Sequence, residues 1–320
     1  LILLIALLLP FSRQKPLVLD HNDDPFVFHL QKESLKIAQF TDLHLAFGFD
    51  ANDRKTLKLI SNITAETKPD LIVLSGDQTL SITAPARHRQ LIRHMESLKT
   101  PWTFVFGNHE ADYHKMERLL KVIFTMNTKY MYFKVGPLLE NGGYGNFTIN
   151  YLYEDNPFYN LYLLDSKAEL KIPGSGRLFV YDYFSEAQVD WYRNKVMNDK
   201  INNIKSTVFA HIPLIQYADA LLIENKDKVK GIIGERISHQ EVDTGFFNAM
   251  VESTVSEAFF AGHDHLNNFT FEKDGIILGY GQISGYNGYG TLRRGARIIE
   301  IDESKMFKTY VVYEDLSYEY

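Results

Sequence analysis

Apolar and polar residues along the first third of the chain follow the two periods of regular secondary structure. Short apolar runs at 35–41, 71–74 and 102–106 predict buried β-strands. Between these runs, apolar residues recur on one face of two predicted helices, at about 52–66 and 84–98. Strand, helix, strand, helix and strand is the order of a parallel sheet covered by helices.

The remaining two thirds of the chain predict a second sheet and further helices. Apolar residues at helical spacing predict helices over 113–126 and 185–202. Strands are expected at 147–153, 158–164, 207–210, 258–261, 267–272, 276–280, 296–301 and 307–313. We therefore predict an α/β fold, a four-layer α/β/β/α sandwich with two mixed β-sheets flanked by helices, as one domain over residues 34–320.

The N-terminal residues 1–15 have a different character. Residues 1–9 are all apolar, and Pro10 with the polar residues 12–15 closes the run. This run is too short to cross a bilayer by itself, since a spanning helix needs about 20 apolar residues. Because the chain begins with Leu rather than Met, we interpret residues 1–15 as the remnant of a signal sequence or membrane anchor, with a buried strand or helix as the alternative.

That interpretation sets the expected location and the role of the next segment. The protein is expected to be extracytoplasmic, either secreted or membrane-anchored through its apolar N-terminal segment, with the cytoplasm as the alternative location. Residues 16–33 contain Pro16, Pro25 and the pair Asp23-Asp24. We interpret them as a linker that leads through a hairpin into the first core strand.

Composition excludes several kinds of chemistry. The formal net charge is −6 and no run rich in Lys or Arg is present, which argues against long nucleic acid as a partner. The chain contains no Cys, which excludes disulfides, thiolate zinc sites and a Cys nucleophile. Any metal ion must therefore be held by nitrogen and oxygen atoms.

The apolar strands end in side chains that bind metals. These are Asp42 and His44, Asp77, Asn108 and His109, His211, and His263 and His265. Residues two apart on a strand share a face, so each such pair could reach one ion. A single pair of this kind occurs by chance, and a lone His near a strand is more often a core residue. Five in order, each at a strand end, point to one site for Mn, Fe, Zn or Ni, whose preferred ligands are carboxylate, amide and imidazole groups.

From about residue 34 onward, the chain resembles the calcineurin-like metallophosphoesterase superfamily in the order of five motifs. They are Asp42-x-His44, Gly76-Asp77, Gly107-Asn108-His109-Glu110, His211 and Gly262-His263-x-His265. The resemblance implies two metal ions bridged by Asp77, one also held by Asp42, His44 and His265 and the other by Asn108, His211 and His263. It also implies that His109 faces the substrate oxygen.

Smaller matches resemble the purple-acid-phosphatase-like group of plants and fungi. They include Tyr144-Gly-Asn-Phe147, His211-Ile-Pro213, Thr244-Gly245-Phe246 and Arg293-Arg294-Gly-Ala-Arg297. Members of that group are described as phosphatases, including phosphoprotein phosphatases, and some are described as inactive. True purple acid phosphatases have a Tyr three residues after the bridging Asp and a Gly in the first motif, where this chain has Leu80 and His44. We therefore expect a pair of Mn, Fe or Zn ions rather than a purple ferric site.

The resemblance and the charge of a phosphate ester together predict a mechanism. A hydroxide that bridges the two metal ions would attack the phosphorus of a phosphomonoester, in a small molecule or a phosphoprotein. The catalytic residues would be Asp77, which bridges the ions, and His109, which would protonate the leaving oxygen or stabilise charge on it. The alternatives are a phosphodiesterase or nucleotide pyrophosphatase with the same metal centre, and a catalytically silent binding protein that retains its metals.

Other residues near the motifs are candidates for substrate contact. They are Asn108, His109, Glu110, Arg294 and Tyr286. Arg294 and Arg297 carry guanidinium groups that fit phosphate, with a solvated or salt-bridged role as the alternative. Tyr286 belongs to the Gly-rich segment 285–290, interpreted either as a loop at the rim of the site or as a simple turn.

Two acidic residues have expected roles beside the motifs. Asp112, together with Glu110, is predicted to orient His109, and the alternative for Asp112 is a cap on the helix at 113–126. Asp264 lies between His263 and His265, so strand alternation should point it away from the metals.

Overall fold

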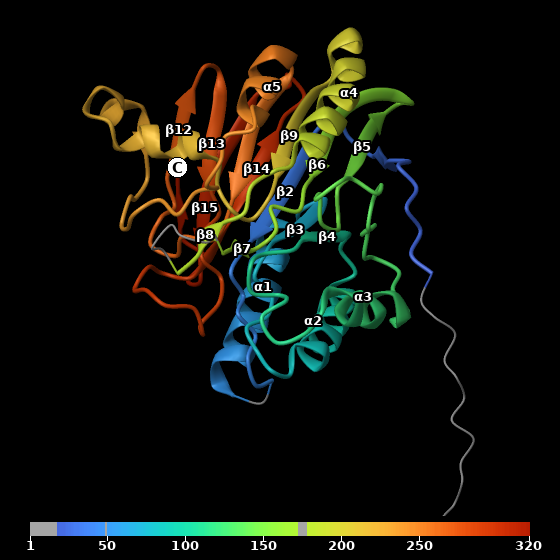
Figure 1. The fold of residues 1–320 in the computed structure, drawn as a ribbon, viewed down its shortest axis with the longest axis vertical. Coiled ribbons are helices and arrows are strands. Elements are labelled where there is room, and N and C mark those ends of the chain that lie inside the picture. The colour runs from blue at the N-terminus through green and yellow to red at the C-terminus, as the bar shows by residue number, and fades with distance from the viewer. Residues whose placement is uncertain (1–17, 49, 172–177) are drawn as a thin grey trace, which may run out of the picture.

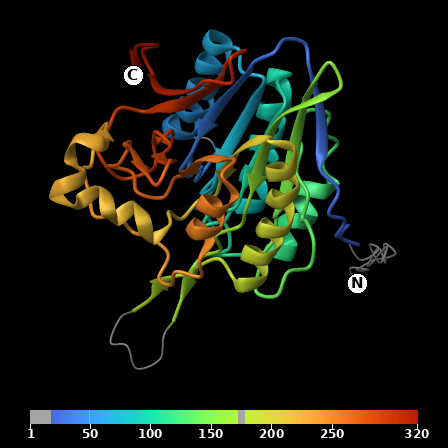
Figure 2. The ribbon, with the colours of Figure 1, turned by 90° about the horizontal axis from the view of Figure 1, so that it is seen from above.

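The computed structural model describes residues 18–48, 50–171 and 178–320, so the predicted signal or anchor at 1–15 lies outside the described residues. Two β-sheets pack face to face, and helices cover their outer faces (Figures 1 and 2). The predicted four-layer α/β/β/α architecture is confirmed. In the described residues, no helix is both long and apolar enough to cross a membrane.

The first sheet has six strands and contains the three strands predicted in the first third of the chain. Its order is β16 (Tyr318–Glu319), β15 (Phe307–Tyr313), β14 (Gly295–Ile301), β2 (Leu35–Phe40), β3 (Leu71–Ser75) and β4 (Trp102–Val105). The strands β2, β3 and β4 run parallel, and the other neighbours run antiparallel. The carboxyl ends of the parallel strands therefore meet at one edge of the sheet.

The second sheet has eight strands and is also mixed. Its order is β1 (Phe26–Leu30), β5 (Phe147–Tyr153), β6 (Asn156–Leu163), β9 (Lys205–Phe209), β11 (Ser256–Ala261), β13 (Ile276–Tyr280), β12 (Thr270–Lys273) and β10 (Val229–Lys230). The strands β6, β9, β11 and β13 run parallel. A separate two-stranded hairpin joins β7 (Glu169–Leu170) to β8 (Val180–Tyr181).

Three helices cover the first sheet, and two cover the second. The first set comprises α1 (Ala51–Thr67), α2 (Ala84–Leu98) and α3 (Met116–Thr125), and the second α4 (Glu186–Asn202) and α5 (Phe246–Ser253). Local signals set their ends: Asp50 caps α1 by accepting from the Asp53 N–H, and Ser185 forms a capping box with Gln188 at the start of α4. Two 3₁₀ helices, η1 (Ile215–Leu221) and η2 (Ile223–Lys228), precede β10.

The hydrophobic core has two parts. The larger part contains side chains of both sheets together with α1 and α2, and Ile37, Phe209 and Phe260 are among its fully buried members. The smaller part lies between the eight-stranded sheet and the helices α4 and α5. This packing fixes the two sheets against each other, so the strand ends of one sheet lie opposite those of the other.

Two local expectations differ from the structure, and one helix was missed. The segment 16–33 does not lead into β2 through a hairpin, because it contains β1, which pairs in parallel with the distant strand β5. The helix expected at 113–126 begins only at Met116, because Lys115 is its N-cap. The helix α5 was not predicted; it has only eight residues, about two turns, so its sequence carries a short periodic signal.

Candidate metal centre

The predicted metal ligands follow five strands whose carboxyl ends converge. Asp42 and His44 follow β2, and Asp77 follows β3. The two sheets are joined here by short contacts: the Asp42 carboxylate accepts from the His263 N–H at 3.0 Å, and the Ser75 carbonyl accepts from His211 Nδ1 at 2.8 Å. The local sequence explains the placement, because each apolar strand is buried up to its end and the polar residues emerge only beyond it.

These side chains form two adjacent clusters. One contains Asp42, His44 and His265, and the other contains Asp77, His211 and His263; within each cluster the candidate ligand atoms lie within 4.8 Å of one another. The carboxylate of Asp77 reaches both clusters, because its Oδ2 lies 3.3 Å from His211 Nε2 and 3.7 Å from His44 Nε2. The Oδ1 atom of Asn108 lies 3.1 Å from His211 Nε2, which places the amide beside the second cluster.

Hydrogen bonds turn two of the imidazoles inward. The Nδ1–H of His211 donates to the Ser75 carbonyl at 2.8 Å, and the Nδ1–H of His265 donates to the Tyr289 carbonyl at 3.2 Å. Both rings therefore present Nε2 to the cluster, the arrangement that outer partners impose on metal-binding histidines. The Nε2 atoms of His44 and His265 lie 3.0 Å apart.

A buried ring nitrogen without a partner indicates that a cation fits beside His263. Within the described part of the chain, His263 Nε2 is buried and has no hydrogen-bond partner. Burial lowers the pKa of His44 to about 4 and, with the charge of His211, that of His263 to about 3. Both rings are therefore neutral at physiological pH, the state that a metal ligand requires.

The aspartates keep their negative charge despite burial. Burial alone would raise the pKa of Asp42, but the hydrogen bond and charge of His265 lower it well below its usual range. The pKa of Asp77 is lowered in the same way by His211, whose own pKa is raised chiefly by the Asp77 charge against the effect of burial. Two buried carboxylates among imidazoles form a donor set suited to transition metals.

The backbone at these positions is unusual. Asp42, His44, Asp77 and His263 have φ values of 54°, 45°, 52° and 81°, in the left-handed region that residues with a side chain rarely adopt. Such a conformation costs about 1–3 kcal/mol per residue, so a concentration of them is typical of functional sites. Gly107 allows a close approach instead, because a Cβ atom there would lie 2.2 Å from Asp77 Oδ1.

His109 lies at the exposed side of the clusters. Its N–H donates to Asp77 Oδ1 at 3.0 Å, and its Nδ1–H donates to Asp112 Oδ2 at 2.7 Å. Burial alone would lower the pKa of His109, but the charges of Asp77 and Asp112 and the bond to Asp112 raise it. The prediction that Asp112 orients His109 is confirmed, and its alternative as a helix cap is wrong because Lys115 caps α3.

Glu110 is a positioning residue. Its buried carboxylate accepts from the backbone N–H groups of Gly107, Asp77 and Thr79 at 2.6, 3.2 and 3.2 Å. Burial, with the nearby charge of Asp77, raises its pKa to about 8. These three bonds join the turn after β3 to the turn after β4, and thus fix Asp77 relative to Asn108. Glu110 does not line the cavity beside the clusters, so substrate contact by Glu110 stays a prediction.

Comparison with known proteins agrees with this geometry. The sequence profile of the family described as Calcineurin-like phosphoesterase matches residues 35–267, well over half of the chain. The chain belongs to the calcineurin-like phosphoesterase family. It is therefore a metallophosphoesterase, a metal-dependent hydrolase of phosphoric esters.

Two curated relatives extend the match. "Probable inactive purple acid phosphatase 14" of Arabidopsis thaliana is 28% identical over 314 residues, covering 86% of this chain and 76% of the relative. "Phosphatase DCR2" of Saccharomyces cerevisiae is 28% identical over 272 residues, covering 75% of this chain and 45% of the relative. One of these names describes a phosphatase, and the other describes a probable inactive phosphatase.

Two solved structures share the fold. A dimetal phosphatase from Danio rerio aligns with a TM-score of 0.58 at 11% identity, over 86% of this chain and 98% of that one. The purple acid phosphatase PPD1 of yellow lupin aligns with a TM-score of 0.54 at 12% identity, over 91% of this chain and 53% of that one. At such identities the likeness concerns the fold alone.

The phosphoesterase has a cavity of about 290 Å³ beside the two clusters. It is lined by His44, Asp77, Leu80, His109, Tyr181, Ser238, His263, Asp264, His265, Asn287, Gly288 and Tyr289. Sequence reasoning did not find Tyr181, which no motif marks, or Ser238. Tyr289 belongs to the Gly-rich segment 285–290 that was interpreted as a rim loop, and its place among the lining residues agrees with that interpretation.

The residues predicted for substrate contact outside the metal motifs, Arg294 and Tyr286, do not line this cavity. The guanidinium of Arg294 donates to the carbonyls of Gly285, Leu292, Gly288 and Gly290, so it holds the loop together. The hydroxyl of Tyr286 donates to Glu314. Substrate contact by Arg294 and Tyr286 stays a prediction that these contacts do not support. Asp264 accepts from the Tyr280 hydroxyl at 2.6 Å and the Ser238 N–H at 3.0 Å, which agrees with its expected structural role.

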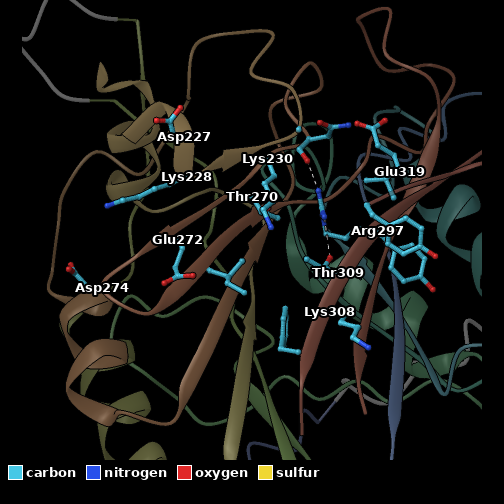
Figure 3. A pocket seen from close by; sticks show the side chains of 17 residues that line it. Asp227, Lys228, Lys230, Thr270, Glu272, Asp274, Arg297, Lys308, Thr309 and Glu319 are labelled. Carbon is cyan, nitrogen blue, oxygen red and sulfur yellow. Dashed lines mark hydrogen bonds between the residues drawn. The ribbon is translucent and has the colours of Figure 1, made fainter. Parts of the chain in front are cut away.

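A larger cavity of about 630 Å³ lies between β12 and β15 (Figure 3). None of the predicted metal ligands is among the described residues that line it. Its central side chain is Arg297, which donates to the backbone carbonyls of Tyr280 and Asn268 and to Thr309 Oγ1, the last at 3.1 Å. Arg297 therefore links the two sheets and does not reach the metal clusters.

Proposed function

We propose that this metallophosphoesterase is a phosphatase that hydrolyses phosphomonoesters, in small molecules or on proteins, with a binuclear centre of Mn, Fe or Zn ions. The single observation that supports it most is the position of Asp77, whose carboxylate lies between two clusters that each present three ligand atoms. In this proposal Asp42, His44 and His265 hold one ion, and Asn108, His211 and His263 hold the other. Asp77 is shared by both ions.

The bound ions would neutralise the phosphoryl oxygens and lower the pKa of a water molecule so that hydroxide forms at neutral pH. The chain itself supplies the proton for the leaving oxygen. Because Asp112 accepts from Nδ1 of His109, the Nε2 atom is the one that faces the cavity. The charges of Asp77 and Asp112 raise the pKa of His109 against the effect of burial, which favours the protonated ring that a general acid needs.

A turnover assay separates the candidates. The purified, metal-loaded protein would be tested on p-nitrophenyl phosphate and on bis-p-nitrophenyl phosphate, before and after chelation. Monoester turnover that is lost on chelation supports the proposal, and preference for the diester favours a phosphodiesterase or nucleotide pyrophosphatase. If two metals remain bound and neither ester is hydrolysed, the protein is a silent binding protein, as the name of one relative suggests for that relative.

A variant tests the role of His109. His109→Ala should keep both metals by elemental analysis and lose about 10²–10⁴-fold in kcat, the usual contribution of general acid–base catalysis. His29→Ala on the edge strand β1 is the control and should have wild-type activity. Loss of a metal from His109→Ala would instead make His109 a metal ligand.

For the cell location we propose that residues 1–15 are a signal sequence or membrane anchor and that the enzyme acts outside the cytoplasm. The apolar run of residues 1–9 supports this proposal. Recovery of the native protein from the soluble cytoplasmic fraction would refute it.

A further inference from the structure

Two tyrosines form walls beside the metal clusters, one at each cluster. The ring of Tyr289 lies nearly parallel to that of His265, with centroids 4.0 Å apart and an angle of 21°. The ring of Tyr181 meets that of His263 edge-on, with centroids 4.4 Å apart and an angle of 85°. Both tyrosines line the cavity of about 290 Å³ that also contains His109. A phosphate held between the clusters would therefore have an aromatic ring close to each cluster, within the same cavity.

The position of Tyr289 is fixed by several contacts. Its hydroxyl donates to Glu235, with both carboxylate oxygens at 2.9 Å, and its carbonyl accepts from His265. Arg294 donates to the carbonyls of Gly288 and Gly290 on either side of it. A wall held in this way loses little conformational entropy when a ligand binds, which favours affinity.

The charges around the cavity restrict the charge that the leaving group of the substrate can have. No Lys or Arg is among the described residues that line the cavity, whereas Asp264 lines it and Glu235 lies directly behind Tyr289. Burial and then the charge of Asp264 raise the pKa of Tyr181 to about 12, so its phenol stays neutral. The leaving group thus meets aromatic faces, the apolar side chain of Leu80 and negative charge.

The size of the cavity restricts the leaving group further. Sites for small molecules measure about 300–1,000 Å³, so a cavity of about 290 Å³ accepts a phosphate with one compact group. Nucleotides with several phosphates need cations beyond the metal centre, and among the described residues that line the cavity only His109 could add one to the histidines of the clusters.

Building on the proposed phosphatase function, we propose that Tyr181 and Tyr289 form an aromatic slot that selects phosphomonoesters of planar aromatic alcohols. The shared chemistry is a phenyl ester of phosphate, either in a small aryl phosphate or in a phosphotyrosine side chain. Offset or edge-to-face contacts between rings favour this group over sugar and glycerol alcohols.

Kinetics on matched esters test the slot. The metal-loaded enzyme would be assayed on phenyl phosphate, a phosphotyrosine peptide, glycerol phosphate and hexafluoroisopropyl phosphate. The last has a leaving alcohol about as acidic as phenol, but not planar, so it separates ring binding from leaving-group reactivity. Tyr181→Leu and Tyr289→Leu should each lower kcat/KM for phenyl phosphate by about 3- to 10-fold, mainly through KM, and leave the two non-aromatic esters unchanged. A peptide turned over like phenyl phosphate would indicate a protein substrate, and a peptide excluded would indicate small aryl esters.

Two further variants test whether a loss of activity comes from a disturbed structure rather than from the loss of a ring contact with the substrate. Tyr289→Phe keeps the ring and should keep the aryl preference, with both metals retained. Tyr318→Leu is the matched control, because Tyr318 also donates to a glutamate, Glu66 at 3.2 Å, but lies on β16 and does not line this cavity. Equal losses on aromatic and non-aromatic esters, or the same loss in Tyr318→Leu, would overturn the proposal.

A binding measurement keeps this proposal separate from the phosphatase function. By calorimetry, the metal-loaded protein should bind phenylphosphonate about 10-fold more tightly than methylphosphonate. The double variant with Tyr181→Leu and Tyr289→Leu should bind the two phosphonates with equal affinity. Absence of turnover on every ester would refute the phosphatase function, and the phosphonates would still decide whether the slot exists. Equal affinity for the two phosphonates would refute the slot.

Discussion

The cavity beside the metal clusters and the larger cavity between β12 and β15 both contain charged residues, yet the two hold them differently. In the smaller cavity the aspartates and most histidines are buried, and four of the ligand positions have a left-handed backbone. In the larger cavity the lysines and Glu272 are exposed, and the buried Arg297 already donates to three acceptors. The larger cavity therefore has fewer buried polar groups without a partner and fewer left-handed backbone positions among its described lining residues.

This difference indicates where a ligand would stabilise the protein. A buried nitrogen without a partner and a strained backbone both lower stability, and a bound cation compensates for them. Beside the smaller cavity, such a nitrogen occurs at His263, and left-handed backbone occurs at His44, Asp77 and His263. Volume alone would have pointed to the wrong place.

The strongest test of the comparison is Asp77→Asn. Because the carboxylate of Asp77 is shared by both clusters, the variant should lose at least one metal and at least about 10³-fold in kcat/KM, more than one electrostatic donor usually contributes. Elemental analysis and the monoester assay measure both effects, with Asp155→Asn, at an exposed turn, as the control. If Asp77→Asn kept two bound metals and near-normal turnover, the smaller cavity would not be the metal site, and the contrast between the two cavities would be wrong.

Arg297→Met tests the larger cavity. The change removes charged donors from two carbonyls and a hydroxyl, so the free energy of unfolding should fall by about 2–4 kcal/mol. The kcat/KM of the metal-loaded protein should remain within about twofold of wild type, because Arg297 does not line the smaller cavity. Urea unfolding and the monoester assay give the two numbers. A loss of kcat/KM without a change in the free energy of unfolding would instead show that Arg297 binds substrate, the role that its sequence motif suggested.

The parts of the fold and of the metal site that the sequence predicts are those set by the pattern of apolar and polar residues within single strands. The strands β13 and β15 were predicted with the bounds that the structure gives them, because alternation and burial act over a few neighbouring residues. The predicted ligands could be recognised because each follows such a strand, and the structure brings them together. The pairing of β1 with β5 joins residues more than a hundred positions apart, so no local signal marks it.

Some side chains have contacts that their sequence motifs do not reveal. Arg294 and Arg297 lie in a motif that suits phosphate, but both guanidinium groups donate to backbone carbonyls, which every residue carries and no sequence motif reveals. Tyr181 is placed by the hairpin of β7 and β8, whose two strands are short and have no clear alternation. The groups that directly follow strands were therefore visible in the sequence, whereas the backbone partners of the two arginines and the place of Tyr181 were not.

Asp165 provides a buried carboxylate outside both cavities. It accepts from the Tyr144 and Lys167 N–H groups, each at 2.8 Å, and burial raises its pKa from 3.8 to about 6. Since the folded state holds the proton more tightly, the contribution of Asp165 to stability is full below pH 3.8 and is lost as the pH rises through 6. Between pH 4 and pH 7, the free energy of unfolding of Asp165→Asn should therefore gain up to about 3 kcal/mol relative to wild type.

The control for Asp165 is activity. Asn supplies one acceptor oxygen where Asp supplies two, so the variant carries a constant cost, and only the change of the difference with pH is diagnostic. The ratio of kcat/KM between variant and wild type should not change with pH, because Asp165 lines neither cavity. A pH-independent difference in stability would show that Asp165 ionises as freely in the folded protein as in the unfolded one.

The smallest effect is expected from Lys308→Gln at the rim of the larger cavity. Lys308 is exposed and its ammonium lies 3.5 Å from Asp302, a surface ion pair of the kind that contributes little. Its removal should change the free energy of unfolding by less than about 0.5 kcal/mol and leave kcat/KM unchanged. Because Lys308 and Arg297 line the same cavity, the pair of variants separates a buried inter-sheet contact from a rim charge. A fall in kcat/KM in Lys308→Gln at unchanged stability would mean that the larger cavity takes part in substrate binding, and the contrast between the two regions would fail.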